Sequence, residues 1–231
     1  MGKSKIIISC EHAGNYIPKS YSYLFEGKDG ILASHRGWDL GSMELGKYIA
    51  RHLEAPFFFQ KVSRLLVEAN RSLDNPELFS EFTAQLPEKQ KRELIDSYHL
   101  AYRQSVIAEI DKALTSFDRV IHVSMHSFTP VLNGVERSVD IGVLVDEGIA
   151  KEAEYANSLK DKISEAIPEM LTMINLPYNG ADDGFTTFLR KQYSPDRYIG
   201  VELEINQKFV GTAQMEVLKK GLVVALDDSS H

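Results

Sequence analysis

The chain has 231 residues, of which 43% are hydrophobic and 26% are charged, and its formal net charge is −7. This composition predicts one globular domain over residues 1–231, and the negative charge excludes recruitment of nucleic acid or of an anionic membrane by the field of the whole molecule. The single cysteine, Cys10, excludes an intramolecular disulfide framework and a cysteine-based zinc cluster, and it indicates a reducing compartment, which we expect to be the cytoplasm.

The first half of the chain alternates short strands with helices. Residues 5–9 (KIIIS) predict a buried strand, because a β-branched run there ends in polar residues. Apolar side chains then recur at helical spacing over 40–54, and a proline ends this helix before a second strand at 57–62. Residues 62–86 have no clean period, and so long an irregular connection is uncommon unless it carries function. A long amphipathic helix is predicted over 87–115.

The second half of the chain continues this alternation of strands and helices. Such a pattern predicts an α/β fold, a three-layer sandwich with a largely buried central sheet that is mostly parallel or mixed. Strands are expected at about 118–125, 139–145, 171–174 and 198–205, and helices at about 149–166, 183–193 and 212–226.

Polar residues gather where these strands end. Ligands of such sheets bind beyond the carboxyl ends of the strands, so side chains at these ends are candidates for one shared site. His12 and His126 suit a divalent metal, although a single histidine at a strand end is more often a hydrogen-bonded structural residue, and His122 is open to that interpretation. The strand-end residues are Glu11, His12, Arg64, Asn70, Arg71, His126, Ser127, Glu202 and Glu204.

The arginine and the glutamates allow specific expectations. Arg71 presents a planar fork that can hold a substrate carboxylate, although a solvated loop with Asp74 as its partner is the alternative. We expect Glu202 and Glu204 to point to opposite faces of the sheet, so that one of them is buried or faces the crevice. A buried carboxylate without a partner is costly and needs a metal, a partner or a proton.

Several segments occur in one order across nearly the whole chain, and together they resemble the N-formylglutamate amidohydrolase family. That family is similar to the zinc carboxypeptidases and aspartoacylases, so the resemblance implies a phosphorylase/hydrolase-like sandwich around a mixed sheet, as in zinc carboxypeptidases. It also implies one zinc ion and hydrolysis of the amide of a small N-acyl amino acid, with N-formylglutamate giving formate and glutamate. The segments are SCEHAGNYIP, HRGWDLGS, SRLLVEANR, MHSF, VDIGVLVD, NLPYNG and VELEINQ.

The resemblance implies roles for individual residues. His12 in HAGN resembles the first histidine of the HxxE zinc motif, and His126 in MHSF resembles the second histidine ligand. Asn70 and Arg71 resemble the pair that holds a substrate carboxylate. Glu204 resembles the glutamate that activates the zinc-bound water.

One position departs from the superfamily pattern. Asn15 stands where the HxxE motif has its glutamate, and an amide is a poor zinc ligand. We expect Asp39 to be the third ligand, with Glu11 as the next candidate, while Asp39 as a plain carboxylate at a helix N-terminus is the alternative. For the donor that stabilises the oxyanion, the candidates are Arg64 and Tyr178.

The sequence leaves several alternatives open. The expected partner is a small acidic molecule, and neither nucleic acid nor a membrane is expected. A different N-acyl amino acid would satisfy the same groups, and a non-catalytic binder of an acidic metabolite or a purely structural use of these residues also remains. Residues 175–185 suit either a fixed wall or a mobile lid. The oligomeric state is not predicted.

Overall fold

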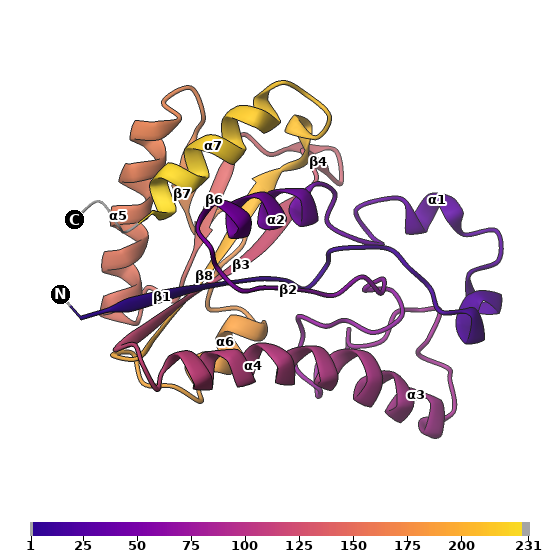
Figure 1. The fold of residues 1–231 in the computed structure, drawn as a ribbon. Helices are drawn as coiled ribbons and strands as arrows, with labels where there is room; N and C mark the ends of the chain where they lie inside the picture. The colour runs from indigo at the N-terminus through magenta and orange to yellow at the C-terminus, as the bar shows by residue number, and fades with distance from the viewer. Residues whose placement is uncertain (1, 228–231) are drawn as a thin grey trace.

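A six-stranded mixed sheet forms the middle layer of the computed structural model, which describes residues 2–227 (Figure 1). Its strand order is β2-β1-β3-β8-β6-β7, in which β6 pairs antiparallel with β8 and the other neighbouring strands pair in parallel. The strands are β1 Ser4–Cys10, β2 Phe57–Phe59, β3 Arg119–Phe128, β6 Ile141–Leu144, β7 Thr172–Ile174 and β8 Tyr198–Asn206.

Helices cover both faces of the sheet, so the predicted three-layer α/β sandwich is confirmed. In Figure 1, α2 and α7 lie above the sheet and α5 stands at its left, while α3, α4 and α6 lie below it. Residues of α2, α5 and α7 share one hydrophobic core. A π-helical stretch joins α3 to α4 and makes the single long helix that the sequence predicted. The helices are α2 Ser42–His52, α3 Glu88–Leu94, α4 Ala101–Ala113, α5 Ala150–Ala166, α6 Phe185–Arg190 and α7 Gln214–Leu226.

The two central strands, β3 and β8, have one apolar face and one polar face. Ile121, Val123 and Met125 join the core beneath α2, α5 and α7. The alternate residues face the other helical layer, and there His126 lies beside Glu204 in the strand register. Residues two apart in a strand share a face, so Glu202 and Glu204 point the same way, and the expectation that they point to opposite faces was wrong.

The irregular connection after β2 is held by its own hydrophobic cluster. Leu65, Leu66 and Leu78 are buried there together with Phe25 and Leu94 from neighbouring segments. The cluster explains how a segment without helical or strand periodicity keeps a defined path next to the sheet. The predicted strand before this segment is shorter than expected, because only Phe57–Phe59 pair with β1.

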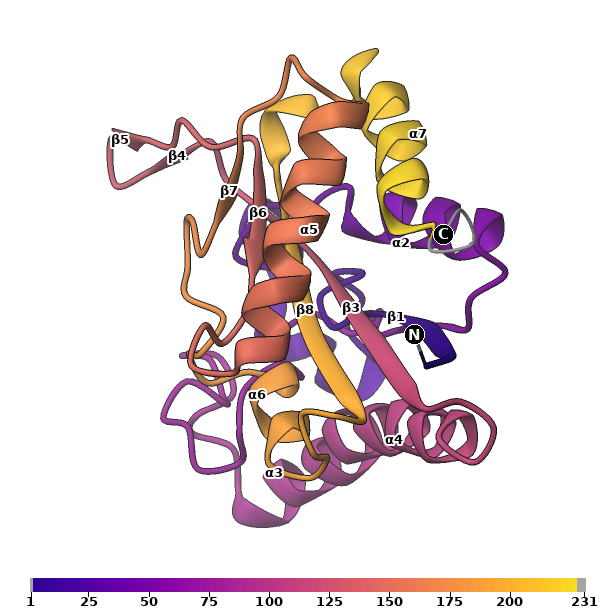
Figure 2. The ribbon, with the colours of Figure 1, turned by 90° about the vertical axis from the view of Figure 1, so that its left-hand side faces the viewer.

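Some short elements were not predicted from the sequence. The β4–β5 hairpin lies between β3 and β6 and projects from the sheet (Figure 2). Within residues 2–227, no helix is both long and apolar enough to cross a membrane. The additional elements are the 3-10 helices Lys19–Phe25 and Gln207–Phe209, helix α1 Asp29–Leu32, and strands β4 Val131–Leu132 and β5 Val135–Glu136.

A buried ion pair joins the two layers of helices through the sheet. Arg190 of α6 donates from Nε to both carboxylate oxygens of Glu152 in α5, at 3.0 and 2.9 Å. The side chains are only 5% and 1% exposed. The backbone of Gly200 in β8 bonds to both partners, and the carbonyl of Gly180 accepts from Arg190. This pair therefore fixes α5, α6, β8 and the loop before α6 to one another.

We predict that Glu152→Ala lowers the free energy of unfolding by about 3–5 kcal/mol, because it leaves Arg190 buried without its carboxylate. Urea denaturation measures this change. Glu154→Ala, at an exposed position on the same helix, is the matched control and is expected to change stability by less than about 0.5 kcal/mol. Equal effects of the two substitutions would contradict the role assigned to the pair.

Candidate metal centre and active site

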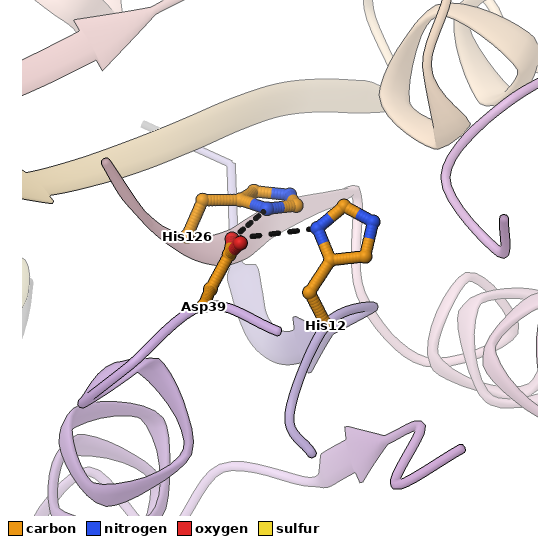
Figure 3. A group of neighbouring side chains, drawn as sticks. All are labelled: His12, Asp39 and His126. Atoms are coloured by element: carbon orange, nitrogen blue, oxygen red, sulfur yellow. Dashed lines mark hydrogen bonds and ion pairs between the residues drawn. The ribbon is translucent and has the colours of Figure 1, made fainter. Parts of the chain in front are cut away.

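Three buried side chains, His12, Asp39 and His126, meet at the carboxyl ends of β1 and β3 (Figure 3). Asp39 Oδ2 lies 3.3 Å from Nδ1 of His12 and 3.0 Å from Nδ1 of His126. β1 and β3 are parallel neighbours, so their ends reach the same edge of the sheet. The backbone N–H of Asp39 donates to the carbonyl of His12 at 3.0 Å, which brings the start of α2 to this edge.

The outer nitrogen of each imidazole faces a second carboxylate. Nε2 of His12 contacts Glu68, and Nε2 of His126 lies 3.2 Å from Glu11 Oε2. A carboxylate that accepts from Nε2–H fixes the tautomer of a neutral imidazole and leaves the Nδ1 lone pair free. Both Nδ1 atoms point to the same oxygen of Asp39. Two imidazole nitrogens and one carboxylate oxygen are the donor set of many catalytic zinc sites, so these residues can hold a divalent metal.

The electrostatics of this group favour positive charge between its members. Burial disfavours a charged imidazole, but hydrogen bonds to Asp39 and Glu11 raise the pKa of His126 well above its ordinary value. Burial would raise the pKa of Glu68, yet the charges of Arg64 and His12 hold it below its ordinary range. Metal ions displace protons from such ligands when they bind. A cation can therefore take the place of the proton between His126 and Asp39.

The structure distinguishes the candidates for the third ligand. The Asp39 carboxylate points at the two histidines and accepts from the backbone N–H of Ser127 at 3.2 Å. It does not cap α2, whose first turn has no side-chain cap, so its interpretation as a plain helix-end carboxylate was wrong. Glu11 lies 3.2 Å from the outer nitrogen of His126, which bonds to the Ser124 hydroxyl at 2.9 Å, and Glu11 accepts from the Tyr102 hydroxyl at 2.7 Å. Asn15 donates to the carbonyl of Leu32, away from the histidines.

Glu204 and Arg64 border the histidine group. Glu204 lies on the same sheet face as His126, and its Oε2 has no hydrogen-bond partner among residues 2–227. Burial, reinforced by the charges of Asp39 and Glu202, raises the pKa of Glu204 to about 8. Arg64 donates to Glu68 Oε2 at 2.8 Å and to Asp39 Oδ1 at 3.3 Å. A buried carboxylate with a free oxygen therefore lies beside the group that can hold a metal.

Asn70 and Arg71 continue from the buried Glu68. The backbone N–H of Asn70 donates to Glu68 Oε1 at 3.0 Å, and its side-chain oxygen accepts from the N–H of Phe185 at 2.8 Å. Arg71 is half-buried and donates from Nη1 to the carbonyl of Asp183. The contact is to a carbonyl of the loop before α6 rather than to Asp74, so the interpretation as a solvated loop paired with Asp74 was wrong.

The second half of the loop over 175–185 is hydrogen-bonded to the segment that follows Arg71. The Asp183 carboxylate accepts from the N–H and hydroxyl of Ser72 at 3.0 and 3.1 Å, and from the side-chain amide of Asn75 at 2.7 Å. Tyr178, in the first half of the loop, is 42% exposed, and its hydroxyl accepts from Arg137 at 2.9 Å.

His122 is a structural histidine, as its alternative interpretation allowed. Its two ring nitrogens bond to the Tyr198 hydroxyl at 2.8 Å and to the Ser9 hydroxyl at 2.7 Å. Burial lowers the pKa of His122 to about 4, so the ring is neutral near pH 7.

Glu68 was not predicted as part of the site. It lies in the irregular segment, where no periodicity indicates which side chains point inward, and its contact with His12 joins residues 56 positions apart. Its place directly before the Ala69-Asn70-Arg71 run was the only available signal.

The sequence model of the N-formylglutamate amidohydrolase family matches residues 4–210. The chain belongs to this family. Membership indicates a hydrolase of the amidohydrolase class. A search of curated protein sequences gave no match.

Two crystal structures share the fold of this family member. The gene product Atu2144 from Agrobacterium tumefaciens has 26% sequence identity and a TM-score of 0.76, over 97% of this chain and 91% of that chain. The N-formylglutamate amidohydrolase from Ralstonia eutropha JMP134 has 15% identity and a TM-score of 0.71, over 95% of this chain and 90% of that chain. At this identity, the second likeness supports the fold alone.

We predict that Glu68→Gln weakens binding of zinc by roughly 10–100-fold, because the amide is a poorer acceptor for His12 Nε2–H than the carboxylate is. Competition with a fluorescent chelator measures the affinity. Glu77→Gln, at an exposed position of the same segment, is the matched control and should leave affinity unchanged. Wild-type affinity in Glu68→Gln would show that the carboxylate does not support the ligand.

Proposed function

We propose that this protein hydrolyses the amide bond of a small N-acyl amino acid, N-formylglutamate, to formate and glutamate, with a zinc ion held by His12, Asp39 and His126. The observation that carries the proposal is the convergence of both Nδ1 atoms on Asp39 Oδ2, 3.3 and 3.0 Å away, beside the unpartnered Oε2 of Glu204. Bound zinc would supply Lewis acidity and lower the pKa of a water toward neutrality.

Glu204 is the general base in this proposal. Its Oε2 accepts the proton from the attacking water and later returns it to the nitrogen of the leaving amine. Its position supports the role, since it is buried next to His126 and has an oxygen free of other hydrogen bonds. A protein that only bound an acidic metabolite would have no use for a general base at this point.

Arg64 is better supported than Tyr178 as the donor to the oxyanion. Arg64 contacts Asp39 and Glu68 and is partly exposed, with 28% of its side chain accessible. Its guanidinium therefore borders the space next to the three ligands, where a preorganised donor stabilises developing negative charge. Tyr178 bonds instead to Arg137.

Asn70 and Arg71 hold the substrate in this proposal. The Arg71 side chain uses Nη1 to bond to the carbonyl of Asp183. The other N–H groups of its guanidinium can donate to a substrate carboxylate. The bonds of Asn70 to Glu68 and Phe185 fix the backbone on which Arg71 is carried. Binding of a carboxylate at Arg71 places the scissile carbonyl and raises the effective concentration of the reacting groups.

We also propose a reducing compartment, the cytoplasm, as the location. Cys10 is a buried free thiol that donates to the Ser42 hydroxyl at 3.2 Å, and the sequence has no second cysteine with which to pair. Burial raises the pKa of Cys10 to about 12, which keeps the thiol protonated and unreactive.

We predict that purified protein contains about one zinc per chain and releases formate from N-formylglutamate. His126→Ala should lose both the zinc and the activity, whereas Glu204→Gln should keep the zinc and lower kcat by roughly 100–10,000-fold. Elemental mass spectrometry and a coupled formate assay measure the two properties.

His52→Ala is the matched control, since His52 is exposed on α2 and bonds only to a backbone carbonyl of its own helix. It should keep both zinc and activity. Zinc that persists in His126→Ala, or formate release that persists in Glu204→Gln, would contradict the roles assigned here.

A further inference from the structure

Arg137, at the base of the β4–β5 hairpin, is a half-buried cation held without a carboxylate. Its guanidinium lies over the rings of Phe128 and Tyr178, with the central carbon 5.6 and 5.0 Å from the two ring centres. Nη1 donates to the Tyr178 hydroxyl at 2.9 Å. No carboxylate of residues 2–227 forms an ion pair with Arg137, although acidic residues outnumber lysine and arginine by 33 to 26 in the chain. Its charge is therefore available to an anion from outside the chain.

The strand register places Arg137 next to the candidate active site. Phe128 pairs with Asn206. This pair lies two residues farther along β3 and β8 than the pair of His126 and Glu204, on the same face of the sheet. Two residues of a strand span about 7 Å. The side-chain amide of Asn206 also donates to the backbone carbonyl of Arg137 at 3.3 Å. The guanidinium over Phe128 thus lies just beyond Glu204 along the strand.

The loop that carries Tyr178 closes the same side of the site. Gly142 pairs with Glu204 across β6 and β8. A Cβ at Gly142 would lie 2.1 Å from the carbonyl oxygen of Leu176 and 3.2 Å from Cβ of Glu204. Only a glycine allows the loop to approach so closely. Tyr178 follows two residues later, so the loop that packs against Gly142 also carries the hydrogen-bond partner of Arg137.

Asn70 and Arg71 lie near the other end of the row that Glu202, Glu204 and Asn206 form along β8. A Cβ at Gly184 would lie 3.2 Å from Glu202 Oε1 and 3.5 Å from the side-chain oxygen of Asn70. Glu202 precedes Glu204 by two residues in β8 and shares its face. Asn70 and Arg71 therefore approach Glu204 from the Glu202 end, and Arg137 approaches it from the Asn206 end.

We propose that Arg137 is the residue that selects dicarboxylic substrates, binding the side-chain carboxylate of an N-acyl amino acid while Arg71 binds the α-carboxylate. This inference rests on the proposed hydrolysis and specifies the substrate class of the same site. Contact with two aromatic rings and the bond to the Tyr178 hydroxyl restrict the orientation of the planar fork, which suits paired bonds to a carboxylate.

The test compares N-formylglutamate with N-formylglutamine, which has the same shape without the side-chain charge. Arg137→Gln should lower kcat/KM for N-formylglutamate by roughly 10–100-fold, mainly through a higher KM, and should change the value for N-formylglutamine by less than about threefold. Arg51→Gln, at an exposed position on α2, is the matched control and should change neither. An equal loss for both compounds would show that Arg137 only supports the hairpin, and would overturn the inference.

Tyr178→Phe separates the two roles open to this tyrosine. If the hydroxyl orients Arg137, the variant loses activity selectively on N-formylglutamate, and by less than Arg137→Gln does. An equal fall of kcat on both compounds would instead make Tyr178 a donor to the oxyanion and would overturn its assignment as the partner of Arg137.

Binding measurements keep the inference separate from the proposed function. If zinc-loaded wild type releases formate from neither compound, the proposed hydrolysis fails. Calorimetric titration of both compounds into wild type and Arg137→Gln then still tests Arg137. A preference of wild type for N-formylglutamate that disappears in the variant supports the inference, and equal affinities of wild type for the two compounds overturn it.

Discussion

The site depends on one buried carboxylate, Asp39, which lies between the Nδ1 atoms of His12 and His126. This interaction joins the ends of β1 and β3 to the segment that begins α2, so fold and site share the same contacts. Burial of three polar side chains is costly unless each has partners. Glu68 and Glu11 supply those partners at the outer nitrogens, and together they leave the inner nitrogens directed at one point.

The rest of the site is arranged along β8 on one face of the sheet. Glu202, Glu204 and Asn206 follow one another at every second position, and loops from distant parts of the chain reach each of them. The rigid strand sets the spacing, while the loops bring the charges of Arg71 and Arg137. This division places arginine side chains that can bind an acidic molecule beside the carboxylates of the site, in a protein with a net charge of −7.

Periodicity predicted most helices and strands, because amphipathic faces and buried runs are local properties of the sequence. The resemblance to a family named His12 and His126. Asp39 became a candidate because Asn15 departs from the family pattern, and Arg64 because it follows a predicted strand; the fold brings these four residues together. Glu68 and Arg137 were not predicted as site residues, since their positions follow from contacts across 56 and 41 residues rather than from a local pattern. The expectation that Glu202 and Glu204 point to opposite faces was wrong, because residues two apart in a strand point to the same face.

The most direct test of the proposed metal centre is X-ray absorption spectroscopy at the zinc edge on zinc-loaded protein, with His126→Ala beside wild type. We predict zinc with nitrogen and oxygen ligands at about 2.0–2.2 Å, two of them imidazoles, and the loss of the bound zinc or of one imidazole in the variant. A spectrum without imidazole, or one that His126→Ala leaves unchanged, would contradict a metal held by His12, Asp39 and His126.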